Sequence, residues 1–402
     1  MIDEALILAA GKGTRMWPLT EFMPKPLLPL CGKPIIEQQI IALKKVGVQK
    51  VHILIGHRMK EISDYLGNGK KYNVKINYII QNEQKGTGHA VSLAKKHIDG
   101  DFYCLNGDTV IDEINLNLLK QNKNGMAMMI TSVEDGSAFG VVKCKGGILE
   151  AIIEKGVAGE ASINAGIYLF SPKIFDAIKK IKKSIRGELE LTDAIVSCKI
   201  KTIEYKGFWK DIGAPWDLIT ANETMINEIS NEKLGVIEDN VTIKGALYLG
   251  ENSLIKSGTY IEGPVWIGPD AIVGPNACIR GATMLGTGAK VGAASEVKNS
   301  ILMEHSKAPH HNYVGDSILG RNCNLGSGTK IANLRHDGAS IYVIIRGERV
   351  DSGLRKLGVI LGDDVKTGIN ASLNVGTILG EETVVGPGRV VSGSWAAGSR
   401  IL

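Results

Sequence analysis

Aliphatic residues recur at every sixth position along the second half of the chain, and this spacing restricts the fold more than any other feature of the sequence. The first unbroken series is Ile237, Ile243, Leu249, Ile255, Ile261, Ile267, Val273, Ile279, Leu285, Val291, Val297 and Met303. A six-residue step is typical of one short strand per face of a triangular coil, with about eighteen residues per turn. The sequence therefore predicts a parallel β-helix of hexapeptide repeats, with the aliphatic side chains inside.

Small or β-branched residues stand four positions after most of these aliphatic residues, as at Ser253, Thr259 and Ala271, and we expect them near the corners. Glycine often follows the aliphatic position, where it relaxes the turn. The series fails after Met303, resumes at Leu319, fails again and restarts at Leu361. We therefore expect two interruptions, and we interpret the first, KAPHHNYVGDS at 307–317, as a loop that leaves the coil.

Strand and helix patterns alternate in the first half. Buried-strand patterns at 4–10, 50–56, 76–81 and 101–108 are interspersed with helical patterns at 34–47 and 86–98. Such alternation predicts an α/β domain with a mostly parallel sheet, whose ligands bind at the carboxyl ends of the strands. Those ends carry Gly11, Gln81 and Asp108. A helical segment at about 215–234 connects the halves, so we expect domains at 1–230 and 236–402.

Composition narrows the functional classes. The 402 residues carry a net charge of +5 without a dense Lys/Arg block interleaved with aromatics, which argues against nucleic acid as a partner. No apolar run reaches the length of a membrane span, so we expect no membrane partner and a cytoplasmic protein. The six cysteines include no Cys-x-x-Cys pair, which favours reduced thiols over metal ligands or disulfides.

A glycine-rich turn follows the first strand pattern, in LAAGKGTRMWPLTEFMPKPLLP at 8–29. A dinucleotide fold would need a third glycine that opens a helix, and a P-loop would need Gly-Lys-Ser/Thr; both are missing here. What remains is a turn flanked by Lys12, Arg15 and Lys25, whose N–H groups and cations can hold phosphate oxygens. The alternative is a glycine turn with solvated charges.

This stretch resembles the opening motif of the sugar-1-phosphate nucleotidylyltransferases, and further motifs follow in that family's order across nearly all of the first half. IIQNEQKGTGHA, with Gln81, Gly86 and Thr87, looks like the base-recognition segment. LNGD, ending at Asp108, and GFWKDIGAPWDL, with Asp211, are similar to its two metal-binding segments. Its sugar-phosphate segments resemble FGVV, IIEKG and INAGIYLF, which carry Gly140, Glu154, Lys155 and Asn164.

The resemblance implies a Rossmann-like domain in which a sugar 1-phosphate attacks the α-phosphorus of a nucleoside triphosphate and pyrophosphate leaves. The nucleophile is already an anion, so positioning and charge neutralisation replace a general base. The family pattern assigns Arg15 to pyrophosphate, Lys25 to the α-phosphate and Lys155 to the sugar phosphate. It assigns Asp108 and Asp211 to Mg²⁺, which prefers oxygen ligands. The sugar hydroxyls would contact Gly140, Glu154 and Asn164, and the nucleotide Ala9, Ala10, Gly11, Gly13, Gln81, Gly86 and Thr87.

The Gln81 amide both donates and accepts hydrogen bonds, which matches the uracil or thymine edge and hence UTP or dTTP. Guanine offers a similar pair, so the base stays open on this argument.

The whole chain resembles the bifunctional enzymes that acetylate an amino-sugar 1-phosphate and then uridylylate it. Their acetyltransferase half carries Gly-His-x-x-Tyr-x-Gly-Asp, then Gly-Ala-Gly-Thr and Asn; here PHHNYVGD at 309–316 is followed by GSGT and Asn333. By this resemblance His310 is catalytic, and Tyr313 and Asn333 line the sugar site. Acetyl-CoA would lie along the coils, with Ala371 and Ser372 as contacts. The family also implies a left-handed β-helix that forms a homotrimer.

The chemistry suits this second resemblance. An amino-sugar amine must lose one proton as it attacks a thioester, and an imidazole can take that proton near neutral pH. The alternative for PHHNYVGD is a polar loop with solvated histidines.

One departure concerns the lysine that bacterial members place soon after the Asn. The first lysine after Asn333 is Lys356, within a long insertion. The possible substitutes are Arg335, Arg346, Arg349, Arg355 and Lys356. The acetyl acceptor therefore stays open between glucosamine 1-phosphate and galactosamine 1-phosphate.

The sequence thus predicts a bifunctional nucleotidylyltransferase and N-acetyltransferase. A second hypothesis is a single-activity nucleotidylyltransferase for glucose or mannose 1-phosphate, with the β-helix as an assembly or regulatory element. A third is a non-catalytic sugar-nucleotide sensor, which is disfavoured because Arg15, Lys25, Asp108 and Asp211 are all present.

Overall fold

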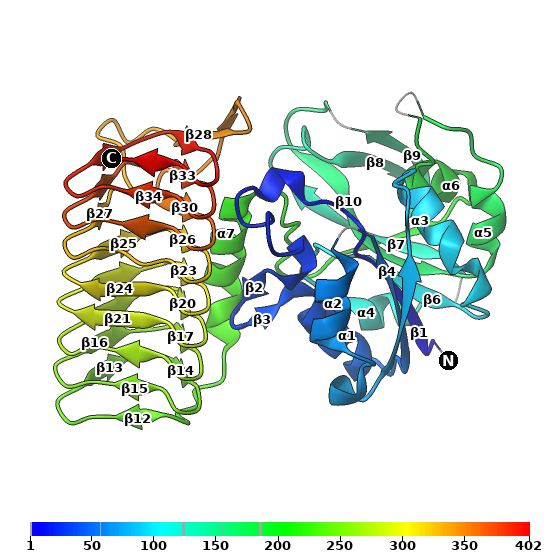
Figure 1. Cartoon of the computed structure of the whole chain (residues 1–402). Helices are drawn as coiled ribbons and strands as arrows, with labels where there is room; N and C mark the ends of the chain where they lie inside the picture. Colours follow the sequence, from blue (N-terminus) through cyan, green and yellow to red (C-terminus); the bar gives the residue numbers. More distant parts are fainter. Residues whose placement is uncertain (1, 57, 123–124, 155, 185–186) are drawn as a thin grey trace. The chain divides into compact units, whose positions relative to one another are not determined.

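The computed structural model describes residues 2–56, 58–122, 125–154, 156–184 and 187–402 (Figure 1). The chain forms two compact units. The first comprises Met1–Lys12, Pro24–Leu27 and Pro34–Asp211, and the second comprises Gly13–Met23, Leu28–Lys33 and Ile212–Leu402. Within the described ranges, no helix is long and apolar enough to cross a membrane.

A nine-stranded mixed sheet forms the centre of the first unit, in the order β5-β4-β1-β6-β10-β7-β11-β9-β8. Four strands pair in parallel where the sequence patterns predict them: β1 (Glu4–Leu8), β4 (Lys50–Ile55), β5 (Lys75–Ile80) and β6 (Phe102–Asn106). The other five, most of them paired antiparallel to a neighbour, complete the sheet: β7 (Ala127–Val133), β8 (Gly140–Lys145), β9 (Ile148–Glu154), β10 (Ala161–Phe170) and β11 (Lys201–Glu204).

Helices cover both faces of this sheet because its strand residues alternate between two cores. Ile7 packs in a core with the buried side chains of α1 (Ile35–Lys45), α2 (Met59–Leu66) and α4 (Glu113–Lys120). Leu6, one residue earlier, packs in the other core with α3 (Thr87–Leu93), α5 (Lys173–Ile178) and α6 (Leu191–Ser197). The period of two therefore gives the two-faced α/β layer that the sequence predicts.

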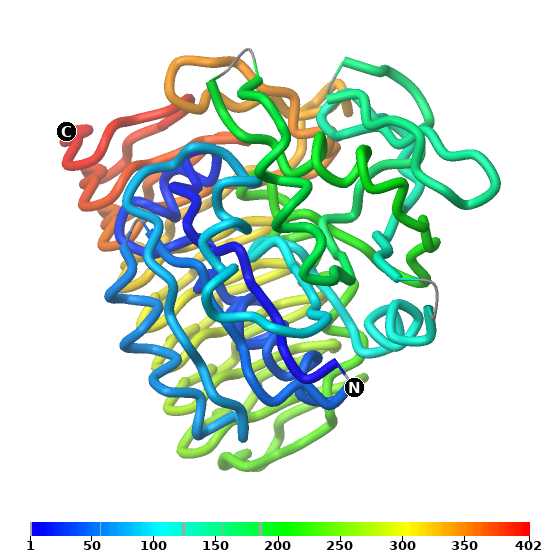
Figure 2. The backbone as a smooth tube through the Cα atoms, turned by 90° about the vertical axis from the view of Figure 1, so that its right-hand side faces the viewer, coloured from blue at the N-terminus to red at the C-terminus, as the bar shows by residue number. Residues whose placement is uncertain are grey.

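The second unit contains a repeat region, residues 236–402, in which each strand pairs in parallel with a strand of the preceding turn (Figures 1 and 2). One sheet comprises β12 (Val236–Ile237), β15 (Leu254–Ile255), β18 (Ile272–Val273), β21 (Lys290–Ala293) and β24 (Lys307–His310). It continues through bridges from Lys307 to Asn324 and Lys366 into β31 (Lys366–Thr367), β34 (Val384–Val385) and β37 (Arg400–Ile401).

Two further sheets have eight strands each. One comprises β13 (Thr242–Lys244), β16 (Tyr260–Glu262), β19 (Cys278–Arg280), β22 (Glu296–Lys298), β25 (Tyr313–Gly315), β27 (Lys330–Ile331), β32 (Ser372–Leu373) and β35 (Val390–Val391). The other comprises β14 (Leu247–Leu249), β17 (Val265–Ile267), β20 (Thr283–Leu285), β23 (Ile301–Leu302), β26 (Ile318–Leu319), β30 (Val359–Leu361), β33 (Thr377–Leu379) and β36 (Ser394–Trp395).

The predicted aliphatic series forms the core of these sheets. Val236 pairs with Leu254 and Leu254 with Ile272, so each early turn takes 18 residues. Ile255, Ile261 and Ile267 are fully buried in one cluster that runs through the repeat region. The small residues expected at the corners are buried too, as Ser253 and Thr259 illustrate.

The first interruption is not a loop, and the expectation that 307–317 leaves the coil is wrong. β24 and β25 pair in parallel with β21 and β22, as ordinary strands of the coil. Only Asn299 and Ser300 separate Lys298 from Ile301, whereas three residues separate their partners Arg280 and Met284. The turn is one residue shorter, so Leu302 rather than Met303 joins the core and the six-residue series loses its phase.

The second interruption does leave the coil. Ile318 pairs with Ile360 and Lys330 pairs with Ser372, 42 residues later in the sequence. The intervening segment forms an antiparallel hairpin of β28 (Tyr342–Ile345) and β29 (Glu348–Asp351). Its β28 strand contacts β33 and β36. Sheet pairing resumes in register after the hairpin.

Helix α7 (Pro215–Met225) covers one outer face of the repeat region. That face carries a column of paired aliphatic residues in which Ile301, Ile318, Ile360 and Ile378 are fully buried. α7 contacts β26, and the Asn222 side chain donates a 2.8 Å hydrogen bond to the carbonyl of Ala282. The helix ends before the expected residue 234: a short 3-10 turn follows at Ile226–Glu228 and the chain then extends.

Adjacent valines of β35 allow a direct test of the core. Val391 is 1% exposed and Val390 is 71% exposed. We expect Val391→Ala to lower the free energy of unfolding by about 2 kcal/mol, because two buried methyl groups are lost. Val390→Ala should change it by less than about 0.5 kcal/mol. Urea unfolding followed by circular dichroism measures both, and equal effects would contradict this placement of the two side chains.

Candidate active sites

An ion pair lies where β6 ends in the first unit. The Lys25 ammonium is 2.5 Å from a carboxylate oxygen of Asp108, and the two side chains are 10% and 28% exposed. The Gln39 amide donates 2.8 Å hydrogen bonds to the carbonyls of Asn106 and Thr109, which fixes the turn that carries Asp108. The turn thus holds one carboxylate beside one largely buried cation.

Asp211 lies on the backbone segment next to this turn. Thr109 and Asp211 form an antiparallel bridge, and the Val110 N–H donates to the carbonyl of Lys210 at 3.0 Å. The two predicted metal ligands, Asp108 and Asp211, are therefore on neighbouring segments. Among the described residues, no group of three or more His, Cys, Asp or Glu could hold a metal ion. Two carboxylates fit Mg²⁺ when phosphate oxygens and water complete its shell.

The glycine turn follows β1 directly. Ala9 and Ala10 are buried, and the Gln84 amide donates a 2.7 Å hydrogen bond to the Ala10 carbonyl. Gly11 is exposed, and Gly13 has a left-handed backbone with φ of 65°. Arg15 is exposed in a 3-10 turn of the segment Gly13–Met23, which belongs to the second unit.

The predicted base-recognition residues lie at the end of β5 and the start of α3. Gln81 is 5% exposed, and its side-chain nitrogen Nε2 is 3.1 Å from Nδ1 of His89. Gly86 has φ of 98°, and a Cβ there would lie 2.5 Å from the Leu189 carbonyl oxygen, so the close approach requires glycine. The Thr87 hydroxyl accepts a 3.0 Å hydrogen bond from the N–H of Leu191.

The predicted sugar residues lie on three antiparallel strands. Gly140 of β8 pairs with Glu154 of β9, and β10 pairs with β8 through Ile163, beside Asn164. The Asn164 amide donates to the Tyr168 hydroxyl at 2.7 Å and accepts from the Gly166 N–H at 3.0 Å. Burial raises the pKa of Tyr168, which keeps this hydroxyl neutral. The predicted Lys155 lies outside the described residues.

His310 is the last residue of β24, and its side chain is exposed. The side chain of Asn312 accepts a 3.0 Å hydrogen bond from the His310 N–H and donates one of 2.8 Å to the Gly326 carbonyl. Asn312 thereby fixes the turn that follows the histidine. His311 occupies that turn with φ of 51°, and its carbonyl accepts a hydrogen bond from the Lys330 ammonium.

Tyr313 and Asn333 meet on the adjacent sheet, around a carboxylate that the sequence interpretation did not single out. The Asn333 amide donates to Asp316 at 2.5 Å and lies 3.5 Å from the Tyr313 hydroxyl. A Cβ at Gly315 would lie 2.5 Å from the Asn333 amide nitrogen, so glycine makes room for this contact. Asp316 is 3% exposed and also accepts a 2.9 Å hydrogen bond from the Asn299 amide.

Lys298 was also missed. Its ammonium is 3.7 Å from Asp316, and it pairs with Gly315 in the sheet, 17 residues later. The turn length would have indicated this neighbour had the shortened turn been recognised. Three of the five basic residues proposed from the insertion have other contacts: Arg335 with Asp337, Arg346 with Glu21, and Arg349 with the Tyr342 ring.

The two predicted acetyl-CoA contacts differ in orientation. Ala371 is fully buried in the repeat core, and its carbonyl accepts a 3.0 Å hydrogen bond from the Lys330 N–H. Ser372 is half-buried and pairs with Lys330 in the sheet. Of the two, only Ser372 offers a side chain to a ligand.

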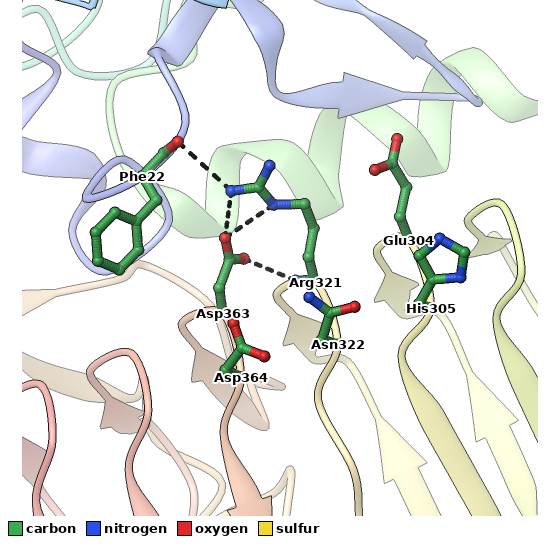
Figure 3. Close-up of a pocket in the computed structure, with 7 residues that line it drawn as sticks. All are labelled: Phe22, Glu304, His305, Arg321, Asn322, Asp363 and Asp364. Carbon is green, nitrogen blue, oxygen red and sulfur yellow. Dashed lines mark hydrogen bonds and ion pairs between the residues drawn. The ribbon is translucent and has the colours of Figure 1, made fainter.

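A third polar cluster lines a pocket in the second unit (Figure 3). Arg321 donates to Asp363 at 2.5 and 2.8 Å, and to the Phe22 carbonyl at 3.5 Å. The remaining lining residues are Glu304, His305, Asn322 and Asp364. None of the predicted site residues lines it, and its strongest side-chain contact is an internal ion pair.

The fold and these groups define a nucleotidyltransferase unit joined to a repeat region of parallel strands. The family model of nucleotidyl transferases matches residues 4–228, and the model named GMPPB C-terminal domain matches 261–397. A solved putative glucose-1-phosphate thymidylyltransferase from Bacillus anthracis is 28% identical with a TM-score of 0.52, covering 58% of this chain and 98% of its own.

Two relatives extend over almost the entire chain. "Bifunctional protein GlmU" of Methanococcus maripaludis strain C7 is 47% identical over 95% of this chain and 93% of its own length. The "bifunctional sugar-1-phosphate nucleotidylyltransferase/acetyltransferase" of Sulfurisphaera tokodaii is 41% identical over 97% of both chains. The chain belongs to this family of bifunctional sugar-1-phosphate nucleotidylyltransferases and acetyltransferases.

Asp316 can be tested by a substitution that preserves the backbone. We expect Asp316→Asn to reduce kcat/KM for acetyl transfer by about tenfold to a hundredfold, because one amide partner loses a charged acceptor. Asn tolerates the left-handed φ of 49° at this position. Asp364→Asn, at an exposed turn with φ of 59°, is the matched control and should leave the rate unchanged. Equal rates for both variants would argue against a role for Asp316.

Proposed function

We propose that the chain catalyses two reactions. One is uridylyl (or thymidylyl) transfer from UTP or dTTP to a sugar 1-phosphate such as N-acetylglucosamine 1-phosphate, with release of pyrophosphate. The other is acetyl transfer from acetyl-CoA to glucosamine 1-phosphate, with galactosamine 1-phosphate as an alternative acceptor. The observation that carries the proposal is the polar cluster of Tyr313, Asn333, Asp316 and Lys298 on one sheet surface, in a chain that also carries the Lys25–Asp108 pair.

For nucleotidylyl transfer, we assign the α-phosphate to Lys25 and the pyrophosphate to Arg15. Asp108 and Asp211 would hold Mg²⁺, which neutralises phosphate charge and orients the triphosphate. Binding and in-line orientation of two anions are the work of these side chains, since the sugar phosphate needs no deprotonation. The ion pair of Lys25 with Asp108 supports this assignment, because each charge keeps a partner in the free enzyme.

The remaining first-unit residues bind the two substrates. The nucleotide would contact the backbone of Ala9, Ala10, Gly11 and Gly13, and the base would contact Gln81, Gly86 and Thr87. Buried Gln81 and the glycine-dependent approach at Gly86 support this assignment. The sugar hydroxyls would meet Gly140, Glu154 and Asn164, and Lys155 would meet the sugar phosphate.

For acetyl transfer, we assign the general base to His310. Its imidazole would take the proton as the amine attacks the thioester carbonyl, the tetrahedral intermediate would collapse, and CoA would leave as the thiol. Tyr313 and Asn333 would line the amino sugar. Lys298, close to Asp316, is the basic residue we favour for the sugar phosphate over those of the insertion. Ser372 and the backbone of Ala371 would contact the pantetheine arm.

The proposal places nucleotidylyl transfer in residues 1–230 and acetyl transfer in 236–402. Strands that pair turn by turn support the inference that 236–402 forms a left-handed β-helix of the family type. We further propose a homotrimer formed through this region, and a cytoplasmic location where UTP and acetyl-CoA are supplied.

One observation favours a second candidate function. The family model that matches 261–397 is named after the C-terminal domain of GMPPB rather than after an acetyltransferase. A single-activity nucleotidylyltransferase, for glucose or mannose 1-phosphate, would use the repeat region only for assembly or regulation.

Acetyl transfer separates the two candidates. The native chain should release free CoA from acetyl-CoA and glucosamine 1-phosphate in a thiol-release assay, with galactosamine 1-phosphate as a second acceptor. We expect His310→Ala to lower this rate by about 10²- to 10⁴-fold, because the general base is lost. The adjacent His311→Ala should retain it. No CoA release with either amino sugar, while UTP still yields pyrophosphate, would favour the single-activity candidate.

The metal assignment has a matched pair of aspartates at the two ends of β6. Asp108→Asn should lower kcat/KM for pyrophosphate release at least about a hundredfold and raise the Mg²⁺ concentration needed for half-maximal rate. Asp101→Asn, at the exposed start of the same strand, should behave like the native chain. Acetyl transfer should survive both changes. An unchanged Mg²⁺ dependence of Asp108→Asn would remove Asp108 from the metal site.

A further inference from the structure

The contact between Gln81 and His89 carries information about the base. The Gln81 backbone N–H already donates to the Ile55 carbonyl at 2.8 Å, and the side chain is 5% exposed. Its Nε2 is 3.1 Å from Nδ1 of His89. An amide nitrogen only donates, so Nδ1 of His89 must act as the acceptor, which requires the neutral imidazole with its proton on Nε2.

We propose that His89 is a positioning residue that sets the orientation of the Gln81 amide and thereby selects uracil over cytosine. This inference rests on the proposed uridylyl transfer. With Nε2 of Gln81 directed at His89, the carbonyl oxygen Oε1 is the end of the amide that meets the base. Oε1 accepts a hydrogen bond from the N3–H of uracil or thymine. Cytosine presents an unprotonated N3 there, so two acceptors would face each other.

Protonation of His89 reverses this preference. A charged imidazole donates from Nδ1, and Gln81 then satisfies it only by turning its amide so that Oε1 faces His89. The Nε2 group would now face the base, where it donates to N3 of cytosine and opposes N3–H of uracil. The selectivity for uracil is therefore coupled to the protonation state of one histidine.

The surroundings of His89 keep it neutral over most of the physiological range. Burial, followed by the Lys85 ammonium, lowers its pKa, and the Glu83 carboxylate partly offsets the shift. Glu83 and Lys85 are themselves paired. The segment that packs on Gly86 and Gly88 adds the carboxylates of Glu188 and Glu190, and α5 adds Asp176, which pairs with Lys95. The charged form thus appears only as the pH falls below about 6.5, the ordinary value for histidine.

Two substitutions distinguish positioning from a structural role. His89→Asp places a carboxylate oxygen, which only accepts, close to the position of Nδ1. His89→Asn has nearly the same size, but its amide can accept from or donate to Gln81 and fixes neither orientation. A merely structural contribution would make these two variants equivalent.

The experiment compares kcat/KM for UTP and CTP by pyrophosphate release, with N-acetylglucosamine 1-phosphate, between pH 5.5 and 8. The ratio cancels the pH dependence of steps that both nucleotides share. For the native chain we expect the UTP/CTP ratio to fall at least about threefold toward the acid end. His89→Asp should keep the high ratio at every pH, and His89→Asn should lower it about tenfold without pH dependence.

The outcomes also separate this inference from the proposed function. Equal ratios for His89→Asp and His89→Asn, or a native pH dependence that persists in His89→Asp, would overturn the role of His89. A native chain that releases no pyrophosphate from UTP or dTTP would instead overturn the proposed nucleotidylyl transfer. Thermal unfolding and acetyl transfer, measured on each variant, show that the substituted chain is folded.

Discussion

The pairing of each strand with the strand one turn earlier is the constraint on which the repeat region depends. Backbone N–H and C=O groups of one turn find their partners in the next, so the turns can stack only in fixed register. This register places Ile255, Ile261 and Ile267 in a common core. It also aligns the outward positions, so that Tyr313, Lys330 and Ser372 occupy successive strands of one sheet. A polar surface is thus assembled from residues far apart in sequence.

Charge compensation organises the first unit in a comparable way. Lys25 is 8% exposed, and a buried cation is costly unless a partner lies close to it. Asp108 supplies that partner at 2.5 Å. In the proposed reaction both groups change partners together: the carboxylate moves to Mg²⁺ and the ammonium to a phosphate. Neither charge is left uncompensated during this exchange, which favours a site that is already formed before the substrates bind.

The sequence predicted the elements whose patterns are local. β1, β4, β5 and β6 lie within the expected ranges because a buried parallel strand is a continuous apolar run between turns. The repeat core was predicted over eleven positions and then misassigned at Met303, because a turn shortened by one residue leaves no local mark in the aliphatic spacing. Asp316 and Lys298 were missed for the same reason: their proximity depends on the register between turns. The contact of Gln81 with His89 joins a strand end to the first turn of a helix, and the amide orientation follows only from the fold.

Sequence separation and spatial separation are decoupled at the hairpin of β28 and β29. Lys330 and Ser372 are 42 residues apart in the chain, yet they are direct neighbours across one strand spacing of about 4.8 Å. The excursion between them can therefore grow, shrink or change composition without altering the distance between these two side chains. Evolution can vary this hairpin freely while the ligand-facing geometry of the ladder stays constant, as though the inserted segment were an accessory attached to a rigid ruler.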